Sequence, residues 1–383
     1  SKAIEKGVPE SVLVSSWKEL VADPNIEIIV ELMGGVEEAK ALVTSALQSG
    51  KHVVTANKAL LAAHGAELLA IAHQKGKKLL FEASVAGGIP ILKALQEGLV
   101  ANRIKSIHGI INGTCNYILT TMRDQKRSYE DVLVDAKRLG YAEAEEALDV
   151  DGHDAAHKAT VLAALAYGVW VPEKDLFTQG IRQIQQQDIV FARQLGYEVK
   201  LLAIIKNDQD QALEIRVNPT LIPLTHVLAS VDGVFNAICL RGDVVGDTLF
   251  YGRGAGEAPT TSAVLADLAE IATSKGKVEA TKPCQALVSK VLPIEEISTR
   301  YYLRLSIADK PGVLAQVAAV LGKNGIGISS VIQPETHKEN AVPLIIMLHE
   351  AKEKQFVQAV REIEGLNVVK APAVWLRVED FSQ

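Results

Sequence analysis

The amino-acid sequence predicts a chain of three parts: an α/β domain with a parallel sheet, an α+β domain with a largely antiparallel sheet, and a ferredoxin-like domain. Strand and helix patterns alternate over the first third of the chain, which is typical of the α/β class. Several strand patterns follow in the middle third, and the end of the chain has the order β-α-β-β-α-β. With 383 residues, the chain is long enough for two or three such domains.

The first domain is predicted over residues 1–83. Its strands are apolar runs rich in β-branched residues, and its helices place apolar residues on one face. The predicted elements are a strand at 26–32, a helix at 36–47, a strand at 52–55, a helix at 59–73 and a strand at 78–82. This order predicts parallel strands whose carboxyl ends share one edge, where the ligands of such sheets bind.

The second domain is predicted over residues 84–276, a linker over 277–299 and the third domain over 300–383. A helix at 257–276 is expected to pack back onto the first domain. The second domain is expected to contain strands at 104–111, 199–205, 213–217 and 235–240 and helices at 152–167 and 260–272. The third is expected to contain strands at 301–307, 326–332, 341–348 and either 366–369 or 374–376, with helices at 313–321 and 352–363.

Composition narrows the class of protein. The net charge of −6 argues against a nucleic-acid partner, because phosphate binding needs a basic face. No apolar run reaches the roughly 18 residues of a membrane span, and the polar start at Ser1 is unlike a signal peptide. Cys115, Cys239 and Cys284 are scattered, which predicts a cytoplasmic protein without disulfides or a cysteine metal site.

Two segments of the first half have the residue types of a ligand site. Lys58 follows the strand at 52–55, where it can donate to a substrate oxygen or a cofactor phosphate; an exposed lysine at a helix start is an equal alternative. The glycine turn at 84–90 can bind a hard cation through backbone oxygens together with Glu82. A plain turn between domains is the simpler interpretation of that segment.

The turn at 112–116 contains Cys115, which can be considered as a nucleophile. A nucleophilic cysteine needs a base and a lowered pKa, and no spacing forces His108 to be that base. An inert cysteine is therefore the favoured interpretation.

The segment at 140–158 is the richest in charged side chains. Asp154 and Lys158 share a helix face, and Glu143 and Asp149 can converge on them from the preceding loop. Because the helix is almost wholly apolar beyond Lys158, it is expected to be buried, and a carboxylate and a lysine there can bind a substrate ammonium and supply a proton. The alternative is a solvated acidic loop with a surface ion pair. The glycine-rich segment at 252–261 can bind an anion at a helix start or be a flexible loop.

Together these segments closely resemble homoserine dehydrogenase, and they occur in the family order. The matching segments are Glu31–Gly35, Gly50–Lys58, Glu82–Pro90, Asn112–Leu119, Gly140–Lys158 and Gly252–Thr261. The last part, with Asp309–Leu314, resembles an ACT domain, a module that often binds regulatory amino acids. The resemblance implies a Rossmann-like nucleotide-binding domain, an α+β substrate and dimerisation domain, and a regulatory ACT domain.

The family interconverts L-homoserine and L-aspartate 4-semialdehyde with NADP or NAD, on the route to threonine and methionine. The resemblance implies Lys158 as proton donor and Lys58 as its partner near the reacting oxygen. The other implied sites are substrate residues Glu143, Asp149 and Asp154; cofactor residues Gly34, Thr55, Lys58 and Gly256; a sodium site of Glu82, Val85, Gly87 and Ile89; and regulatory residues Asp309, Gly312 and Asn324. Threonine is the expected effector, and a homodimer or homotetramer the expected assembly.

The sequence departs from the family pattern at two places. Glu145 and Glu146 stand where the family usually has Asp-Pro, and the first strand with its G-x-G-x-x-G loop is missing before Ser1. We therefore expect an additional N-terminal segment, in which the choice between NAD and NADP would be encoded. Two other functions are compatible with the sequence: an aspartate-semialdehyde dehydrogenase that uses Cys115, and a non-catalytic protein that senses an amino acid.

Overall fold

The computed structural model describes residues 2–142, 146–208, 212–274, 290–334 and 341–381. Contacts divide the chain into two compact units. The first contains residues 1–100, 160–173 and 255–287, and the second contains residues 101–159, 174–254 and 288–383. Glu143, Cys284 and most of the expected linker lie outside the described residues.

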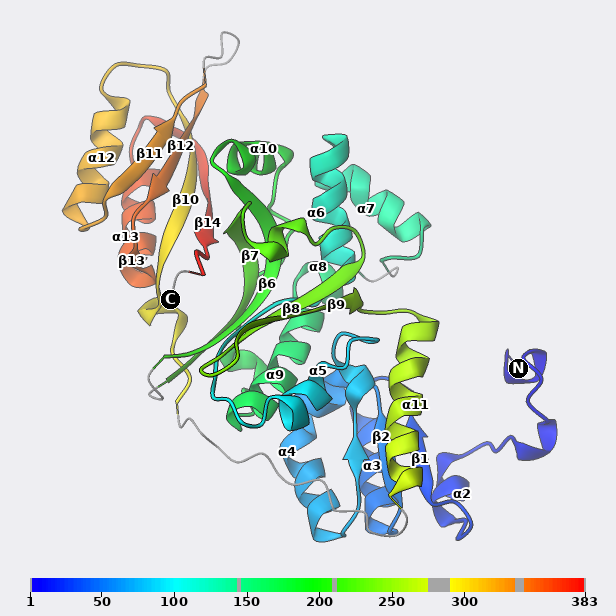
Figure 1. The fold of residues 1–383 in the computed structure, drawn as a ribbon. Helices are drawn as coiled ribbons and strands as arrows, with labels where there is room; N and C mark the ends of the chain where they lie inside the picture. Colours follow the sequence, from blue (N-terminus) through cyan, green and yellow to red (C-terminus); the bar gives the residue numbers. More distant parts are fainter. Residues whose placement is uncertain (1, 143–145, 209–211, 275–289, 335–340, 382–383) are drawn as a thin grey trace. The chain divides into compact units, whose positions relative to one another are not determined.

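The first unit contains a parallel three-stranded sheet, as the alternating pattern predicts (Figure 1). Its strands lie in the order β1-β2-β3, with Ile28 opposite His52 and Val53 opposite Leu79. The strands and main helices are β1 (Ile28–Glu31), α3 (Glu37–Gln48), β2 (His52–Thr55), α4 (Lys58–Gln74), β3 (Leu79–Leu80) and α11 (Glu257–Thr273). Shorter helices are α1 (Lys2–Glu5), η1 (Glu10–Val12), α2 (Trp17–Ala22), α5 (Ile91–Lys93) and η3 (Ala94–Gly98).

Helix α11 covers one face of this sheet, although it is distant from the strands in sequence. Val54 of β2 packs with Val264 and Ile271 of α11. Val53 points to the opposite face and is also fully buried, and α3 packs against β1 and β2. Burial on both faces explains why these strands are nearly continuous apolar runs.

Strand β3 is shorter than the strand predicted at 78–82. Only Leu79 and Leu80 form it, and Glu82 begins a short 3₁₀ turn, η2 (Glu82–Ser84). The backbone N–H of Glu82 donates to Asp267 Oδ2 of α11 at 2.9 Å. A side chain therefore takes the place of a neighbouring strand as the partner of this N–H.

The second unit is built on a large sheet, in which neighbouring strands of the series β7-β6-β4-β8-β9 are antiparallel. This confirms the predicted α+β class. The strands are β4 (Ile104–Ile110), β6 (Tyr197–Asp208), β7 (Ala212–Pro223), β8 (Phe235–Gly242) and β9 (Gly246–Arg253), with the short β5 (Phe177–Thr178) beside β7. The helices are α6 (Gly113–Gln125), α7 (Tyr129–Arg138), α8 (Ala147–Val150), α10 (Gln186–Gln194) and η5 (Val227–Ser230). Two further helices, α9 (His153–Tyr167) and η4 (Glu173–Asp175), have residues in both units.

The ferredoxin-like order is confirmed at the end of the chain, where the strands lie in the order β11-β12-β10-β14. The elements are η6 (Ile294–Glu296), β10 (Ser298–Ile307), α12 (Val313–Lys323), β11 (Ile328–Ile332), β12 (Val342–Leu348), β13 (Ala351–Lys352), α13 (Glu353–Glu364) and β14 (Val369–Val378). The final strand is thus one long element and not either of the two short alternatives. Strand β14 also pairs in parallel with β7, with Arg377 opposite Thr220, so the sheet continues from one part into the other (Figure 1).

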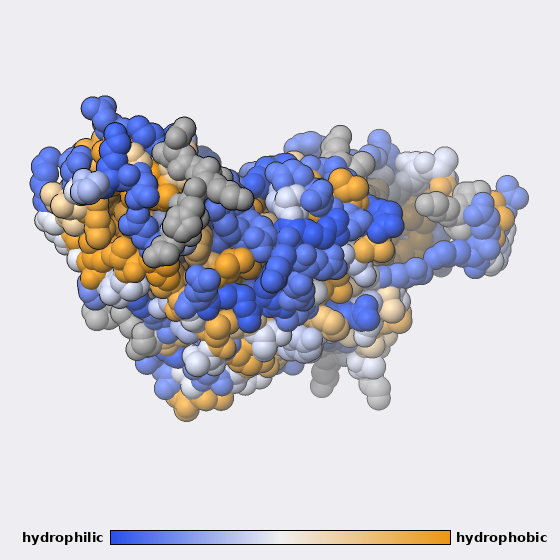
Figure 2. Space-filling model, turned by 90° about the horizontal axis from the view of Figure 1, so that it is seen from above, coloured by the Kyte–Doolittle hydropathy of each residue, from blue (hydrophilic) through white to orange (hydrophobic). Residues whose placement is uncertain are grey.

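Seen from above, the ferredoxin-like part shows hydrophobic residues at its surface (Figure 2), and Leu314 and Val331 are exposed there. Over the described residues, no helix has both the length and the apolar character needed to cross a bilayer.

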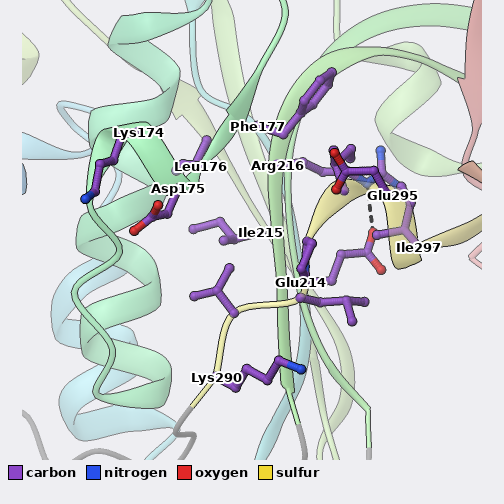
Figure 3. Close-up of a pocket in the computed structure, with 14 residues that line it drawn as sticks. Lys174, Asp175, Leu176, Phe177, Glu214, Ile215, Arg216, Lys290, Glu295 and Ile297 are labelled. Carbon is purple, nitrogen blue, oxygen red and sulfur yellow. Dashed lines mark hydrogen bonds and ion pairs between the residues drawn. The ribbon is translucent and has the colours of Figure 1, made fainter. Parts of the chain in front are cut away.

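A cavity of ≈ 580 Å³ lies beside β7 in the second unit. Its lining includes Glu214 and Arg216 of β7 and the segment 290–295 (Figure 3). This segment lies beside β7, because Val291 forms a parallel bridge with Leu213. The two charged groups of β7 are engaged with each other, because Arg216 Nε donates to Glu214 at 2.8 Å, and Arg216 Nη1 also donates to Asn218 at 2.9 Å. The cavity contains none of the site residues predicted for the second unit.

Candidate active site

Lys158 and Asp154 form a buried ion pair near the start of α9, as their spacing predicts. Lys158 Nζ donates to Asp154 Oδ2 at 2.7 Å and to the carbonyl oxygen of Ile111 at 2.8 Å. Both residues are buried, and each is only 8 % exposed. Two of the three N–H groups of the ammonium therefore have protein acceptors, and among the described residues the third has none.

Asn112 connects this pair to Asp149. Its Nδ2 donates to Asp149 Oδ1 at 2.8 Å and to Asp154 Oδ2 at 3.0 Å. Thr114 Oγ1 lies 3.3 Å from the other oxygen of Asp149. Burial raises the pKa of Asp149, and the negative charge of Asp154 raises it further, whereas Asn112 and Lys158 lower it. Five residues of the segments at 112–116 and 140–158 thus meet in one polar cluster.

The structure disfavours Cys115 as a nucleophile. The residue is fully buried, and its Sγ donates to the carbonyl oxygen of Asp149 at 3.2 Å. Burial raises the pKa of the thiol well above its usual value, and the nearby charges of Asp149 and Asp154 add to this effect. A nucleophilic cysteine requires the opposite shift.

In the first unit, two of the predicted cofactor residues, Thr55 and Lys58, lie at or just after the carboxyl end of β2. Thr55 Oγ1 donates to Glu31 Oε2 at 2.6 Å, and the N–H of Met33 donates to Glu31 Oε1 at 2.8 Å. Asn57 caps α4 and donates through Nδ2 to the carbonyl oxygen of Gly35 at 2.7 Å. These bonds hold the loop after β1 against the end of β2.

Gly34 and Gly35 in this loop have φ values of 76° and 70°, where glycine is strongly preferred. No atom lies within 4 Å of a Cβ placed on either residue, so there is open space beside the loop. Lys58 is the first residue of α4, and Gly256 directly precedes α11 with φ 119°. Helix starts offer unpaired backbone N–H groups to an anion, which suits the phosphates of a dinucleotide.

The predicted sodium residues form a buried turn in the first unit. Both oxygens of the Glu82 carboxylate accept backbone N–H groups, from Leu92 and Lys93 at 2.9 Å each. Burial raises the pKa of Glu82. Among the residues that the structure describes, no N–H donates to the carbonyl oxygens of Val85 and Gly87. Unpaired carbonyl oxygens beside a buried carboxylate match the oxygen ligands that hard cations bind.

The regulatory residues predicted in the last domain lie at the two ends of α12. Asp309 is exposed before this helix, and Gly312 directly precedes it with φ 86°. Asn324 ends the helix and donates through Nδ2 to the carbonyl oxygen of Val320 at 2.9 Å.

The side-chain role of Asn112 was missed from the sequence, where this segment was considered only for Cys115. The available signal was an asparagine directly after a buried strand and before a helix. Such a residue is typical of an N-cap, and Asn112 Oδ1 does accept the N–H of Cys115 at 2.8 Å. Nothing in the local sequence indicates that the other end of the amide reaches Asp149 and Asp154.

Known proteins of one family are similar to this chain over nearly its whole length. Family models match for the NAD binding domain of homoserine dehydrogenase at residues 1–82, homoserine dehydrogenase at residues 90–269 and the ACT domain at residues 301–367. The chain is 44% identical to homoserine dehydrogenase of Neisseria gonorrhoeae over 97% of this chain and 87% of that protein. It is 45% identical to the enzyme of Pseudomonas aeruginosa, over 95% of this chain and 86% of that protein.

Solved structures give the same result. A homoserine dehydrogenase from Thiobacillus denitrificans is 44% identical and superposes with a TM-score of 0.93, covering 100% of this chain and 88% of that chain. A hyperthermophilic archaeal homoserine dehydrogenase in complex with NADPH is 29% identical, with a TM-score of 0.60 over 70% of this chain and 80% of that chain. On the strength of these matches over nearly its whole length, the chain belongs to the homoserine dehydrogenase family.

Proposed function

We propose that the chain interconverts L-homoserine and L-aspartate 4-semialdehyde with NAD(P), and that Lys158 is its proton donor. The observation that carries this proposal is the buried cluster of Lys158, Asp154, Asn112 and Asp149. It joins a lysine ammonium to two carboxylates in one place. A substrate with an α-ammonium group and an oxygen that gains a proton needs both kinds of group.

The proposed chemistry follows from these side chains. The nicotinamide, when bound, gives a hydride to the aldehyde carbon or takes one from the alcohol. Lys158 stabilises the developing alkoxide with its free N–H and protonates it, and in the reverse direction its neutral amine accepts the hydroxyl proton. Asp154 fixes the position of Lys158, while Asp149, Asp154 and Glu143 provide negative charge for the substrate ammonium. Lys58 assists at the same oxygen.

The cofactor is assigned to the first unit. Gly34, Thr55, Lys58 and Gly256 would contact it, because they lie in the glycine loop after β1, at the end of β2 and at two helix starts. The relative solved with NADPH supports a dinucleotide of this class. Glu82 and the carbonyl oxygens of Val85, Gly87 and Ile89 would hold a sodium ion, whose part is structural. The carbonyl oxygens of Val85 and Gly87, which accept no N–H among the described residues, support this assignment, whereas that of Ile89 accepts the N–H of Ile91 at 2.8 Å.

Replacement of Lys158 by Ala tests the proposal. We expect homoserine oxidation to fall by at least about a hundredfold, which is the usual contribution of a positioned acid or base. NADP binding, measured by quenching of protein fluorescence, should remain within about twofold, since Lys158 lies among the substrate residues. Lys174→Ala, an exposed lysine of the same unit, is the control. Near-normal turnover in Lys158→Ala would refute the assignment.

We also propose that the ACT domain binds an amino-acid effector, threonine, at the ends of α12. Asp309 and Asn324 offer a carboxylate and an amide, and Gly312 leaves the helix start open, with no atom within 4 Å of a Cβ placed on it. The exposed Val331 lies on β11, the edge strand of this sheet. An edge strand with apolar residues is suited to pairing with a second copy, which supports a homodimer or homotetramer.

A further inference from the structure

We propose that Asn112 is a positioning residue of the homoserine dehydrogenase reaction: its amide NH₂ group holds Asp149 and Asp154 side by side, where they meet the substrate ammonium. This inference rests on the proposed function of Lys158 and its neighbouring carboxylates. It assigns to Asn112 a role that neither its helix-capping position nor its sequence motif requires.

The hydrogen-bond network fixes the orientation of this amide. Asn112 Oδ1 accepts the N–H of Cys115 in the first turn of α6, so Nδ2 must point the other way. There its two hydrogens have two acceptors, Asp149 Oδ1 at 2.8 Å and Asp154 Oδ2 at 3.0 Å. Asn112 is only 4 % exposed, and all three of these bonds are inside the protein. The side chain therefore has one orientation that satisfies every polar atom.

The end of β4 holds both members of the catalytic ion pair. The carbonyl oxygen of Ile111 accepts from Lys158 Nζ, and the next side chain, Asn112, donates to Asp154. Asp154 Oδ2 thus receives hydrogens from Lys158 and Asn112 together. Movement of Asn112 would leave Asp154 less well positioned. Because Asp154 orients Lys158, the remaining N–H of Lys158 would then no longer have a fixed direction.

Asparagine is suited to this position because it donates two hydrogens and carries no charge. The charged groups that act on Asp149 are Asp154 and Lys158 of α9, and the neutral Thr114 of α6 also contacts it. Asp151 follows two residues after Asp149, at the end of α8. Asp151 is engaged by Arg182 at 2.5 Å. Two carboxylates held near each other disfavour their common ionisation. A neutral NH₂ shared between them favours the ionised forms, without competing with the substrate ammonium as a cation would.

Capping of α6 is a separate role, and two substitutions separate it from the donor role. Ser and Asp are both good N-cap residues. Asn112→Ser keeps a cap but lacks the NH₂ group, and Asn112→Asp keeps the cap and the shape but adds a negative charge. If Asn112 only capped α6, Asn112→Ser would behave like the wild type.

Asn116 offers a matched control on the same helix. Asn116 is 2 % exposed. Its Nδ2 also donates to two acceptors, the backbone carbonyl oxygens of Val231 and Phe235, at 3.0 and 3.2 Å. Neither acceptor belongs to the proposed substrate site. Asn116→Ser therefore removes a buried amide with the same number of donated bonds and leaves the carboxylates unchanged.

The test is the pH dependence of homoserine oxidation by the full chain, with NADP affinity and thermal unfolding measured in parallel. For Asn112→Ser we expect the KM for homoserine to rise about tenfold or more, the order that bonds to charged groups contribute. The acid limb of kcat/KM should move to higher pH, because the carboxylates lose a donor that favours ionisation. Asn112→Asp should show a larger effect in the same direction. NADP affinity should stay within about twofold in both.

Three results would overturn the proposal. The first is an unchanged KM and acid limb in Asn112→Ser. The second is a uniform loss at all pH values that Asn116→Ser reproduces together with its loss of thermal stability, which would show a merely structural role. The third is a loss of NADP affinity that equals the loss of homoserine affinity. Full turnover in Lys158→Ala would instead refute the proposed function, so the two failures are distinguishable.

Discussion

Replacement of Glu379 by Gln is expected to destabilise the second unit strongly, although this residue lies near the end of the chain. Glu379 follows β14 and is 6 % exposed. Its two carboxylate oxygens accept hydrogen bonds from Lys206 Nζ at 2.7 and 2.6 Å, and Oε2 also accepts from Arg216 Nη2 at 3.3 Å. Its backbone N–H donates to Leu221 of β7 at 2.9 Å. Through these hydrogen bonds, the carboxylate connects the end of the last strand, β14, to β6 and β7 of the large sheet.

The magnitude follows from the burial of Arg216, which is 1 % exposed. Removal of one partner of a buried ion pair costs about 3–5 kcal/mol, because it leaves a charge uncompensated. Glu214 also bonds to Arg216, at 2.8 Å, and therefore limits the loss. Gln keeps the size and one acceptor oxygen. We expect Glu379→Gln to lower the free energy of unfolding by about 2–4 kcal/mol at neutral pH.

The loss should depend on pH in a defined direction. Burial alone would raise the pKa of Glu379, but His108, whose Nε2 lies 3.8 Å away, together with Lys206 and Arg216, lowers it below its usual value. A carboxylate with a lowered folded pKa stabilises the protein above its unfolded pKa, which is about 4.3, and this stabilisation is lost as pH falls further. The difference between wild type and Glu379→Gln should thus be largest near pH 7 and smaller at pH 4.

Urea unfolding followed by tryptophan fluorescence measures this difference, since Trp375 lies on β14. The control is Glu296→Gln, whose carboxylate is half exposed and pairs with Lys352 at 3.1 Å; its loss should have little effect. The reasoning is refuted if Glu379→Gln costs no more than the control at pH 7. It is also refuted if the cost is the same at both pH values.

Two further outcomes test the function from other directions. Cys115→Ala should keep homoserine oxidation within a few-fold of wild type, because the buried thiol has a raised pKa; abolished turnover with an intact fold would revive the cysteine mechanism. Saturating threonine should inhibit the wild type but not Asp309→Ala, and unchanged kinetics of the wild type would exclude threonine as the effector.

The fold was largely predictable because most elements carry strong local signals. The strand at His52–Thr55 is β-branched and lies between two helix patterns, and the structure has the same bounds. Strand β9 was missed because its side chains alternate between exposed and half-buried positions, with none fully buried. The length of β3 was wrong because Asp267, far away in sequence, binds the N–H of Glu82. Such a partner leaves no trace in the local pattern.

The candidate site was predictable to the extent that its groups are charged and regularly spaced. Asp154 and Lys158 lie four residues apart on a helix, so their contact follows from helix geometry alone. Asn112 joins them from a position 42 residues before Asp154, and only the tertiary structure creates that contact. The role of an amide depends on which acceptors tertiary structure brings to it, whereas a lysine beside a carboxylate is evident from the chain. A neutral side chain that positions charged ones is therefore difficult to recognise from a sequence pattern. The kinetics of Asn112→Ser decide whether Asn112 acts in this way.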